Sequence, residues 1–219
     1  MLHTFNLDQK IAALRREYTF GKMEDGAAAK DPFLQFKRWI EDALCQKILH
    51  LDTMALATAA KNGRPSVRMV LLKSFDRNGF VFYTHYDSRK GQELQKNPHA
   101  EIVLFWGPLE RQVRIAGRIM RLPASESDRY FASRPRETQI GCWASHQSKP
   151  IKNRTAMEEA YRQAAEKFHG KKVPRPPQWG GYRLVPESFE FWQGRASRMN
   201  DRIFYSKHDR RWKIIRLQP

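Results

Sequence analysis

The sequence contains very little cysteine, with only Cys45 and Cys142 among 219 residues. Two thiols cannot build a disulfide framework, and neither belongs to a Cys-x-x-Cys pair of the kind that binds zinc. No apolar run approaches the ~20 residues that span a bilayer, and residues 1–10 lack the apolar core of a signal peptide. We therefore expect a cytoplasmic protein with reduced thiols and no membrane segment.

Several sequence motifs of catalysis are also missing. There is no HExxH, Walker loop, GxSxG or GxGxxG. The seven histidines show no metal-binding spacing, and His146 and His169 are isolated. The sequence thus favours no metal site and no activated nucleophile. Its polar residues suit the binding of an anionic ligand, as in an enzyme whose cofactor carries the chemistry.

Acidic residues are scarce relative to basic ones. The chain has 40 Lys and Arg against 23 Asp and Glu, a formal net charge of +17. Such an excess predicts anionic partners, which include nucleic acid, an acidic membrane surface or small phosphorylated ligands. Composition alone favours nucleic acid, so the positions of the cations must decide.

The hydrophobic pattern predicts a mainly antiparallel β protein with flanking α-helices. Residues 7–18 have helical spacing, 19–30 resemble a mobile linker, and Asp31-Pro32 begins a second helix. Nine strands are expected, at 54–59, 66–75, 80–84, 101–106, 111–122, 182–186, 189–193, 203–205 and 212–217. Further helices are expected at 88–97, 125–133, 137–144 and 153–169. The strands suffice to close a small barrel, so residues 31–219 are expected to form one domain after an N-terminal segment, 1–30.

Two clusters of cations are candidates for phosphate binding. Ser88-Arg89-Lys90 lies at a predicted helix start, where free N–H groups favour an anion, although a solvated basic turn is the alternative. Arg68 and Lys73 bracket one apolar strand. Their odd spacing places them on opposite faces of a regular strand, and ordinary strand-end charges are the simpler interpretation.

A third candidate combines hydroxyl and guanidinium groups. Tyr130, Arg134 and Thr138 are four residues apart and would share one face of a continuous helix, although Pro135 disfavours helical geometry at Arg134. A phosphate cradle and a solvated helix face are equally good interpretations. Near the end of the chain, the polar run from Arg198 to Arg202 after Gly194 suggests a binding loop.

Together these segments resemble the pyridoxamine 5'-phosphate oxidase family over nearly the whole chain. The matching segments are Leu14-Arg15-Arg16-Glu17-Tyr18, Arg68-Met69-Val70-Leu71-Leu72-Lys73, Phe82-Tyr83-Thr84, Ser88-Arg89-Lys90, Leu109-Glu110-Arg111-Gln112-Val113, Ser133-Arg134-Pro135-Arg136, Gln139-Ile140-Gly141, Trp179-Gly180-Gly181 and residues 189–202. Many segments in consistent order make the resemblance specific. It implies an FMN-binding split β-barrel, antiparallel and Greek-key-like, that forms a homodimer with FMN at the subunit interface.

The resemblance also implies roles for individual residues. The implied cofactor-binding residues are Arg68, Met69, Val70, Leu71, Leu72, Lys73, Tyr83, Thr84, Arg89, Lys90, Gln112, Gln147, Ser148, Trp192 and Arg202. The implied substrate-binding residues are Arg15, Arg16, Glu17, Tyr18, Lys73, Tyr130, Arg134, Thr138, Arg198, Met199 and Asn200, of which Arg198 and Asn200 would be catalytic. Residues 15–18 would cover the site.

The implied reaction oxidises pyridoxine or pyridoxamine 5'-phosphate to pyridoxal 5'-phosphate. Dioxygen is reduced to hydrogen peroxide, and the amine substrate releases ammonia. The chain departs from the family pattern Arg-x-His-Asp-Arg, because Asn200 stands where the family has His and cannot carry a charge near neutral pH. Thr138, where the family often has Ser, keeps its hydroxyl. The alternatives are a split-barrel flavoprotein with another substrate, a non-catalytic carrier of flavin or pyridoxal phosphate, or a basic nucleic-acid-binding protein.

Overall fold

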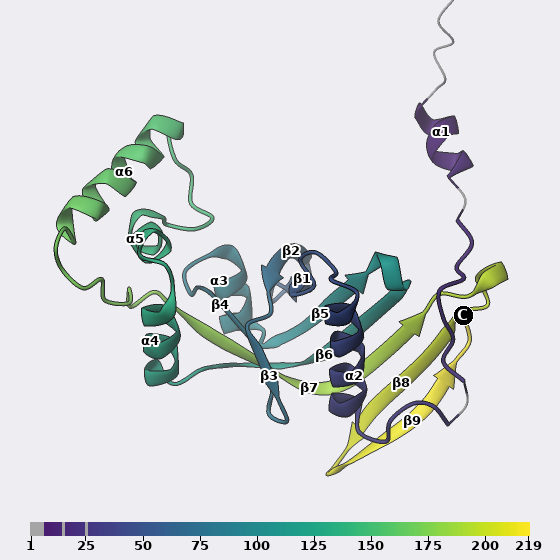
Figure 1. Cartoon of the computed structure of the whole chain (residues 1–219). Coiled ribbons are helices and arrows are strands. Elements are labelled where there is room, and N and C mark those ends of the chain that lie inside the picture. Colours follow the sequence, from purple (N-terminus) through teal and green to yellow (C-terminus); the bar gives the residue numbers. More distant parts are fainter. Residues whose placement is uncertain (1–6, 15, 25) are drawn as a thin grey trace, which may run out of the picture.

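The computed structural model of the chain describes residues 7–14, 16–24 and 26–219. Its centre is one curved sheet in which all paired strands are antiparallel (Figure 1). The strands are β1 Thr53–Ala59, β2 Pro65–Leu71, β3 Ser74–Asp76, β4 Gly79–His85, β5 His99–Trp106, β6 Arg111–Arg121, β7 Trp179–Gln193, β8 Asp201–His208 and β9 Arg211–Leu217. Their order is β2-β1-β5-β6-β7-β4-β3, and β8 pairs with both β7 and β9. This is the expected split-barrel architecture.

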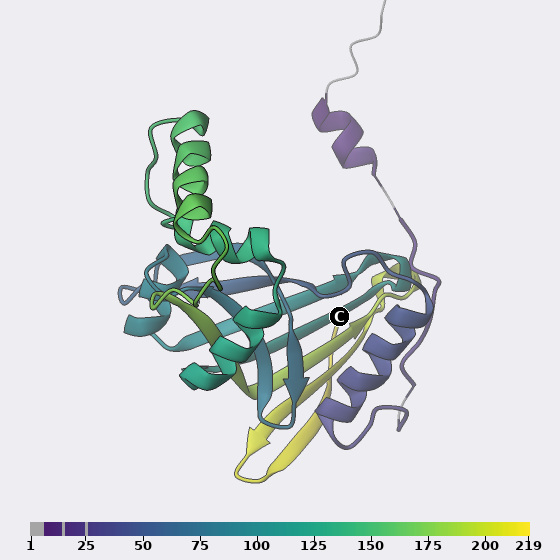
Figure 2. The same cartoon turned by 60° about the vertical axis from the view of Figure 1, so that its left-hand side comes forward.

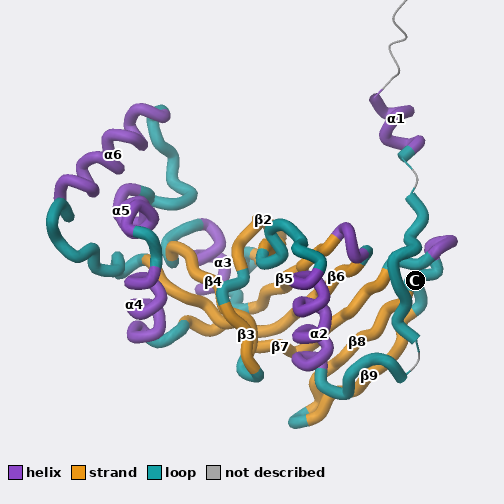
Figure 3. The backbone as a smooth tube through the Cα atoms, viewed as in Figure 1, coloured by secondary structure: helices purple, strands orange, loops and turns teal. Residues whose placement is uncertain are grey.

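The helices lie around this sheet rather than within it (Figure 3). They are α1 Leu7–Ala13, α2 Pro32–Cys45, α3 Arg89–Lys96, α4 Ala124–Ser133, α5 Arg136–Ala144 and α6 Arg154–Lys167. As expected, Asp31 caps α2 by accepting a hydrogen bond from the backbone N–H of Phe33, and Pro32 begins the helix. Figure 1 shows α4, α5 and α6 together at one end of the sheet.

Aromatic packing fixes α2 against the sheet. Phe36 is fully buried and meets Phe80 edge to face at 4.9 Å, while Trp39 meets Phe191 at 5.2 Å. Such pairs add to the free energy gained from burial itself, and truncation of one such ring costs about 3–5 kcal/mol. The strands that carry the site therefore rest on a rigid core.

Strand β7 is the longest element of the sheet, with 15 residues. The sequence predicted two short strands here, at 182–186 and 189–193, and that prediction is wrong. The strand continues because Pro186 pairs with Gly117 where the β6–β7 register shifts, and an irregularity of this kind tolerates a residue without an N–H group. The first half of β7 pairs with β4 and the second half with β8.

The single strand predicted over residues 66–75 is also wrong. It divides into β2, which ends at Leu71, and β3, which begins at Ser74. Leu72 turns its side chain into the core, where it is 6% exposed, and the backbone N–H of Lys73 donates to Val81. The break lets β2 pair with β1 while β3 pairs with β4.

The N-terminal helix is shorter than predicted. The helix predicted over 7–18 ends at Ala13, and its apolar side chains Leu7, Ile11 and Leu14 are exposed. A short helix with no packed face gains little stability from its neighbours, and Figure 2 shows α1 standing away from the sheet. In the stretch expected as a mobile linker, the backbone N–H groups of Phe20 and Met23 donate to Glu110 and Asp201.

The face of the sheet opposite the core carries several exposed apolar side chains. Val67, Met69, Leu71 and Phe105 are 45–68% exposed. Met69 of β2 pairs with Ala55 of β1, and Ala55 pairs with Val103 of β5. This register places the four exposed side chains on one face of the sheet. In the described part of the chain, no helix has the length and apolarity needed to cross a bilayer.

Candidate functional site

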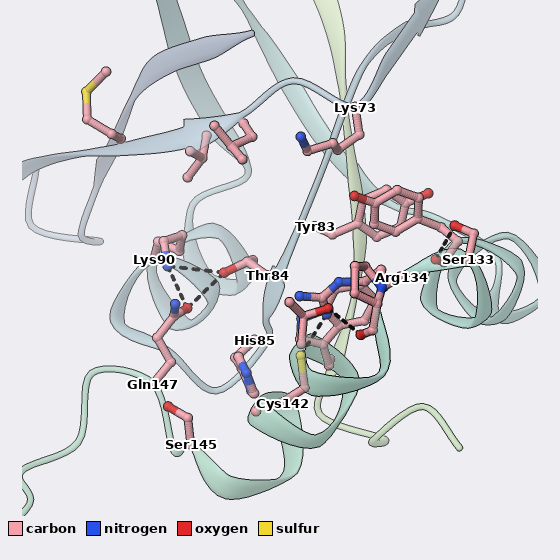
Figure 4. A pocket seen from close by; sticks show the side chains of 18 residues that line it. Lys73, Tyr83, Thr84, His85, Lys90, Ser133, Arg134, Cys142, Ser145 and Gln147 are labelled. Atoms are coloured by element: carbon pink, nitrogen blue, oxygen red, sulfur yellow. Dashed lines mark hydrogen bonds between the residues drawn. The ribbon is translucent and has the colours of Figure 1, made fainter. Parts of the chain in front are cut away.

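A cavity of about 670 Å³ opens where β2 and β4 meet the helices α3, α4 and α5 (Figure 4). Its volume lies within the range of small-molecule and cofactor sites. It is lined by Met69, Val70, Leu71, Lys73, Tyr83, Thr84, His85, Lys90, Tyr130, Ser133, Arg134, Pro135, Thr138, Gly141, Cys142, Ser145, Gln147 and Trp179. We refer to this cavity as the pocket.

Lys90 is the buried cation of the pocket, with 7% of its surface exposed. Its ammonium group donates to Thr84 at 3.1 Å and to Gln147 at 2.8 Å, and it forms no ion pair among the described residues. Burial lowers the pKa of Lys90 to about 8, the nearby charge of Arg68 adds to this effect, and Glu93 opposes it. Ser88 caps the helix that carries Lys90, so free N–H groups accompany the cation.

Two arginines stand beside Lys90 without lining the pocket. Arg68 and Arg89 both bind the carboxylate of Glu93, at 3.3 and 2.9 Å. Burial opposes ionisation of Glu93, but hydrogen bonds from Ser66, Arg89 and others outweigh it and lower the pKa to about 2. Glu93 is therefore a permanent anion that links a strand arginine to a helix arginine.

A second cationic group lies on the opposite side of the pocket from Lys90 (Figure 4). The Arg134 guanidinium lies 4.8 Å from the Trp179 ring and donates to the Cys142 sulfur at 2.8 Å. Lys73 reaches the same cavity and pairs with Asp52 at 2.8 Å. This side of the pocket thus presents two cations that are held by fixed neighbours.

Hydroxyl and aromatic groups complete that side. Tyr83 stacks on Tyr130 with ring centroids 3.8 Å apart, and on Trp179 at 5.4 Å. Thr138 donates its hydroxyl to the Pro135 carbonyl at 2.7 Å. Tyr130 and Thr138 both line the pocket with Arg134. The break at Pro135 therefore does not separate the three residues that the sequence placed on one helix face.

A second group of predicted site residues lies at the other end of β7. Tyr18 meets Trp192 edge to face at 5.4 Å, and the Arg198 guanidinium lies 5.6 Å from the Tyr18 ring. The Asn200 side chain accepts a hydrogen bond from the Arg195 N–H at 3.0 Å. Arg202 forms a two-pronged ion pair with Glu190, at 2.8 and 3.1 Å.

Close packing holds the N-terminal segment on this second group. Glu17 accepts from the Ser197 N–H at 3.0 Å. A Cβ atom on Gly194 would lie 2.6 Å from Cγ of Tyr18, so only glycine permits the contact. Ser197 and Arg198 have φ of 55° and 61°, a conformation that costs energy in residues other than glycine. The loop is thus held in a fixed, strained form beside Tyr18.

The predicted site residues therefore separate into three sets, and one set, Arg68, Arg89 and Ser148, does not line the pocket. Those that line the pocket are Met69, Val70, Leu71, Lys73, Tyr83, Thr84, Lys90, Tyr130, Arg134, Thr138 and Gln147. Those near the far end of β7 are Arg16, Glu17, Tyr18, Gln112, Trp192, Arg198, Met199, Asn200 and Arg202. Arg15 lies outside the described residues, and the side chain of Leu72 is buried in the core.

Sequence reasoning missed several residues of the pocket and its surroundings. His85 lines the pocket, its Nδ1 atom has no hydrogen-bond partner in the described chain, and burial lowers its pKa. Cys142, eight residues after Arg134, and Trp179 hold the Arg134 guanidinium, but neither is a cation and neither was predicted to be a site residue. Glu93 did leave a local signal, because it follows Arg89 by four residues, the spacing of a helical ion pair.

Comparison with known proteins shows which family the chain belongs to, because two family models match it. The model described as "Pyridoxamine 5'-phosphate oxidase" matches residues 40–168, and the model described as "Pyridoxine 5'-phosphate oxidase C-terminal dimerisation region" matches residues 179–219. The chain belongs to the pyridoxamine 5'-phosphate oxidase family. The first model spans all of the pocket lining except Trp179. The second spans β7, β8 and β9, which include Trp192 and Arg202, and the loop with Arg198, Met199 and Asn200.

Relatives of the family match almost end to end. The chain is 49% identical to a pyridoxine/pyridoxamine 5'-phosphate oxidase of Rubrobacter xylanophilus, covering 95% of this chain and 96% of that protein. It is 50% identical to a protein of the same name from Burkholderia vietnamiensis, covering 95% and 99%.

A solved structure of PhzG from Burkholderia lata 383, in complex with tetrahydrophenazine-1-carboxylic acid, is also similar. It has a TM-score of 0.83 and 34% identity, and the match covers 87% of this chain and 94% of that one. An FMN-binding protein from Nostoc punctiforme, at 21% identity, has a TM-score of 0.68 over 84% of this chain and 97% of its own length, and supports the split-barrel fold.

Proposed function

We propose that this protein is an oxidoreductase that converts pyridoxine and pyridoxamine 5'-phosphates to pyridoxal 5'-phosphate with bound FMN. The observation that carries the proposal is the pair of cationic groups on opposite sides of one pocket. One group surrounds Lys90 and the other contains Lys73 and Arg134. A cofactor and a substrate that each bear a phosphate would need two such groups. The names of the relatives, pyridoxine/pyridoxamine 5'-phosphate oxidase, support the same assignment.

The residues near Lys90 fit the phosphate of FMN. A buried ammonium without an anionic partner is unfavourable, and a phosphate would supply that partner. Arg68 and Arg89 add guanidinium groups suited to phosphate oxygens, and the α3 N-terminus adds N–H groups. The Met69, Val70 and Leu71 stretch of β2 would lie along the rest of the cofactor.

The opposite side of the pocket fits the substrate phosphate. Lys73 and Arg134 supply charge, and the hydroxyls of Tyr130 and Thr138 supply hydrogen bonds. Guanidinium and hydroxyl groups together satisfy more phosphate oxygens than charge alone. A substrate anchored in this way would present its ring to the flavin in a fixed orientation, which accounts for much of the rate in such reactions.

A homodimer would complete the site. Trp192 lies at the end of β7 opposite the pocket residue Trp179, and Arg198, Asn200 and Arg202 follow in the loop and in β8, so we infer that these four residues reach the pocket of a second copy. The exposed apolar face of β2 and β5 provides a surface that a second copy would cover. The matched dimerisation region, residues 179–219, contains the same residues.

Bound FMN would supply the two-electron chemistry, taking electrons from the substrate and passing them to dioxygen to give hydrogen peroxide. The chain's own residues would bind, orient and shield the reactants. Arg198 would lie beside the substrate ring, and residues 15–18 would cover it. Asn200 would offer hydrogen bonds without exchanging a proton, unlike the His of the family pattern.

The deciding experiment is an anaerobic titration of FMN-loaded protein with pyridoxine 5'-phosphate, followed by flavin absorbance. Bleaching that air reverses, with hydrogen peroxide formed in proportion, is the expected result. Protein that binds FMN but stays oxidised would contradict the substrate assignment. Protein that binds no FMN would contradict the whole proposal.

PhzG provides a specific second candidate, because its solved complex contains a carboxylated ring compound rather than a phosphate ester. Lys73 and Arg134 would also attract a carboxylate. The same titration with a reduced tricyclic carboxylic acid distinguishes the two. Faster bleaching by that compound than by pyridoxine 5'-phosphate would favour the PhzG-like substrate.

A further inference from the structure

We propose that Glu93 is a positioning residue that selects the phosphorylated form of the flavin, because it fixes Arg68 and Arg89 toward one anion. The inference rests on the proposed FMN function. Glu93 belongs to none of the segments that carry the family resemblance, and it does not line the pocket. It acts through the two arginines, one from β2 and one from α3.

Side chains from two strands and from α3 donate to the one buried carboxylate of Glu93. Glu93 is 7% exposed. It accepts hydrogen bonds from Thr58 at 2.5 Å, Ser66 at 2.6 Å, Arg89 at 2.9 Å and Arg68 at 3.3 Å. A carboxylate with this many donors is ionised at any working pH, so its hold on the arginines does not vary near neutrality.

The Arg68 guanidinium is held in one orientation by four hydrogen bonds. Its guanidinium donates to the Thr58 hydroxyl at 2.6 Å, to the Ser66 hydroxyl at 2.5 Å and to the Leu56 carbonyl at 3.2 Å, in addition to Glu93. An arginine fixed in this way loses little conformational entropy when a phosphate binds. Arg89, with 61% of its side chain exposed, forms an ion pair with Glu93 and with no other described residue.

The net charge of this cluster matches the charge of a phosphate. Arg68, Arg89 and Lys90 carry three positive charges, and Glu93 carries one negative charge. Two positive charges remain in excess, which complements a phosphate monoester that carries nearly two negative charges at pH 7. Riboflavin, which lacks the phosphate, would gain nothing from this arrangement. The predicted consequence is selectivity for FMN over riboflavin.

The test compares dissociation constants of FMN and riboflavin for the full-length protein and for Glu93→Gln, by quenching of flavin fluorescence. The variant keeps the shape of the side chain and removes its charge. We expect FMN affinity to fall about tenfold, the size of one lost charge-assisted hydrogen bond, and riboflavin affinity to change less than about twofold. If simple electrostatic repulsion of phosphate by Glu93 dominated, FMN would instead bind more tightly, and this would overturn the inference.

A matched control is Glu158→Gln. Glu158 also pairs through Nε of an arginine four residues earlier, Arg154, at 2.8 Å, but it is exposed on α6. It should leave both dissociation constants unchanged. Equal loss of both flavins in Glu93→Gln would indicate a general structural defect and overturn the positioning role.

Glu93→Asp gives a second measurement if the first variant does not fold. It retains the charge but withdraws the carboxylate by one methylene, so a selective loss of FMN affinity is again expected, and unchanged selectivity contradicts the inference. Failure of the wild-type protein to bind FMN would overturn the proposed function itself. Wild-type FMN binding with unchanged selectivity in the variants would overturn only the role of Glu93.

Discussion

Trp179 and Trp192 belong to the same strand, β7, but contact different groups of site residues. Trp179 holds Arg134 in the pocket, whereas Trp192 packs against Tyr18 at the other end. At about 3.3 Å per residue, the two positions are roughly 40 Å apart along an extended strand. A single continuous element therefore keeps the two groups separate within one chain, and in the proposed homodimer a second copy would bring them together.

Mixed dimers test this arrangement directly. Lys73→Met should inactivate the pocket, and Arg198→Met should inactivate the second group, so each variant alone should be nearly inactive. In a mixed dimer, one site combines both defects and the other is intact. Random pairing on co-expression should therefore restore about a quarter of wild-type activity, because half of the dimers carry one intact site.

The control for that experiment pairs Lys73→Met with Arg134→Met, which both change the pocket. No mixed dimer of these two variants contains an intact site, so activity should not recover. Recovery in the control, or no recovery in the first mixture, would contradict a site shared between subunits.

Arg134→Lys tests the substrate side of the pocket. Lysine cannot form a two-pronged bond to phosphate or reproduce the stacking over Trp179. We expect the KM for pyridoxine 5'-phosphate to rise at least about tenfold, the cost of one charge-assisted hydrogen bond, while FMN affinity is unchanged. Steady-state kinetics and flavin titration measure the two effects. Arg129→Lys, in helix α4, whose C-cap is Arg134, but outside the pocket lining, is the matched control, and equal effects of both variants would contradict the assignment.

Asn200→His tests the departure from the family pattern. Histidine carries a titratable ring with an ordinary pKa near ~6.5, whereas asparagine carries none. Turnover should increase, and the pH profile of kcat should gain a step near that pKa that the wild-type protein lacks. Asn200→Gln, which adds no titratable group, should gain neither. An unchanged rate and profile in Asn200→His would show that residue 200 takes no part in proton handling.

The elements of the fold were largely predictable because their signals are local. The Asp31-Pro32 start of α2 and the alternation in β1 both follow from short-range patterns. Two predictions failed where tertiary contacts decide the outcome. The burial of Leu72 breaks a strand, and the register shift near Pro186 joins two strands into one. Neither effect leaves a signal within a few residues of sequence.

The site was predictable to a lesser degree. Cationic motifs located Lys90 and Arg134, but spacing could not show that these residues lie on opposite sides of one pocket. Glu93 and Trp179 act through other side chains, so no motif for ligand binding marks them. Their roles depend on tertiary contacts, because Glu93 of α3 meets Arg68 of β2, and Trp179 at the start of β7 meets Arg134.

The depressed pKa of Lys90 predicts how FMN affinity depends on pH. Burial lowers this pKa to about 8 in the free protein, and a bound phosphate favours the protonated amine. Affinity should therefore be constant between pH 7 and about 8, where Lys90 is already charged. Above about 8 the ligand must recharge the amine, so log Kd should rise by up to about one unit per pH unit. Starting at pH 7 keeps the phosphate, with its pKa near ~6, doubly charged.

Riboflavin and Lys90→Met separate this effect from general loss of structure. Riboflavin has no phosphate to couple with the amine, so its affinity should stay flat across the same range. Lys90→Met should bind FMN more weakly at pH 7 and lose the dependence between pH 8 and pH 9.5. Fluorescence titrations at half-unit intervals measure all three curves. A dependence that persists in Lys90→Met would assign the titration to another group and remove Lys90 from the phosphate site.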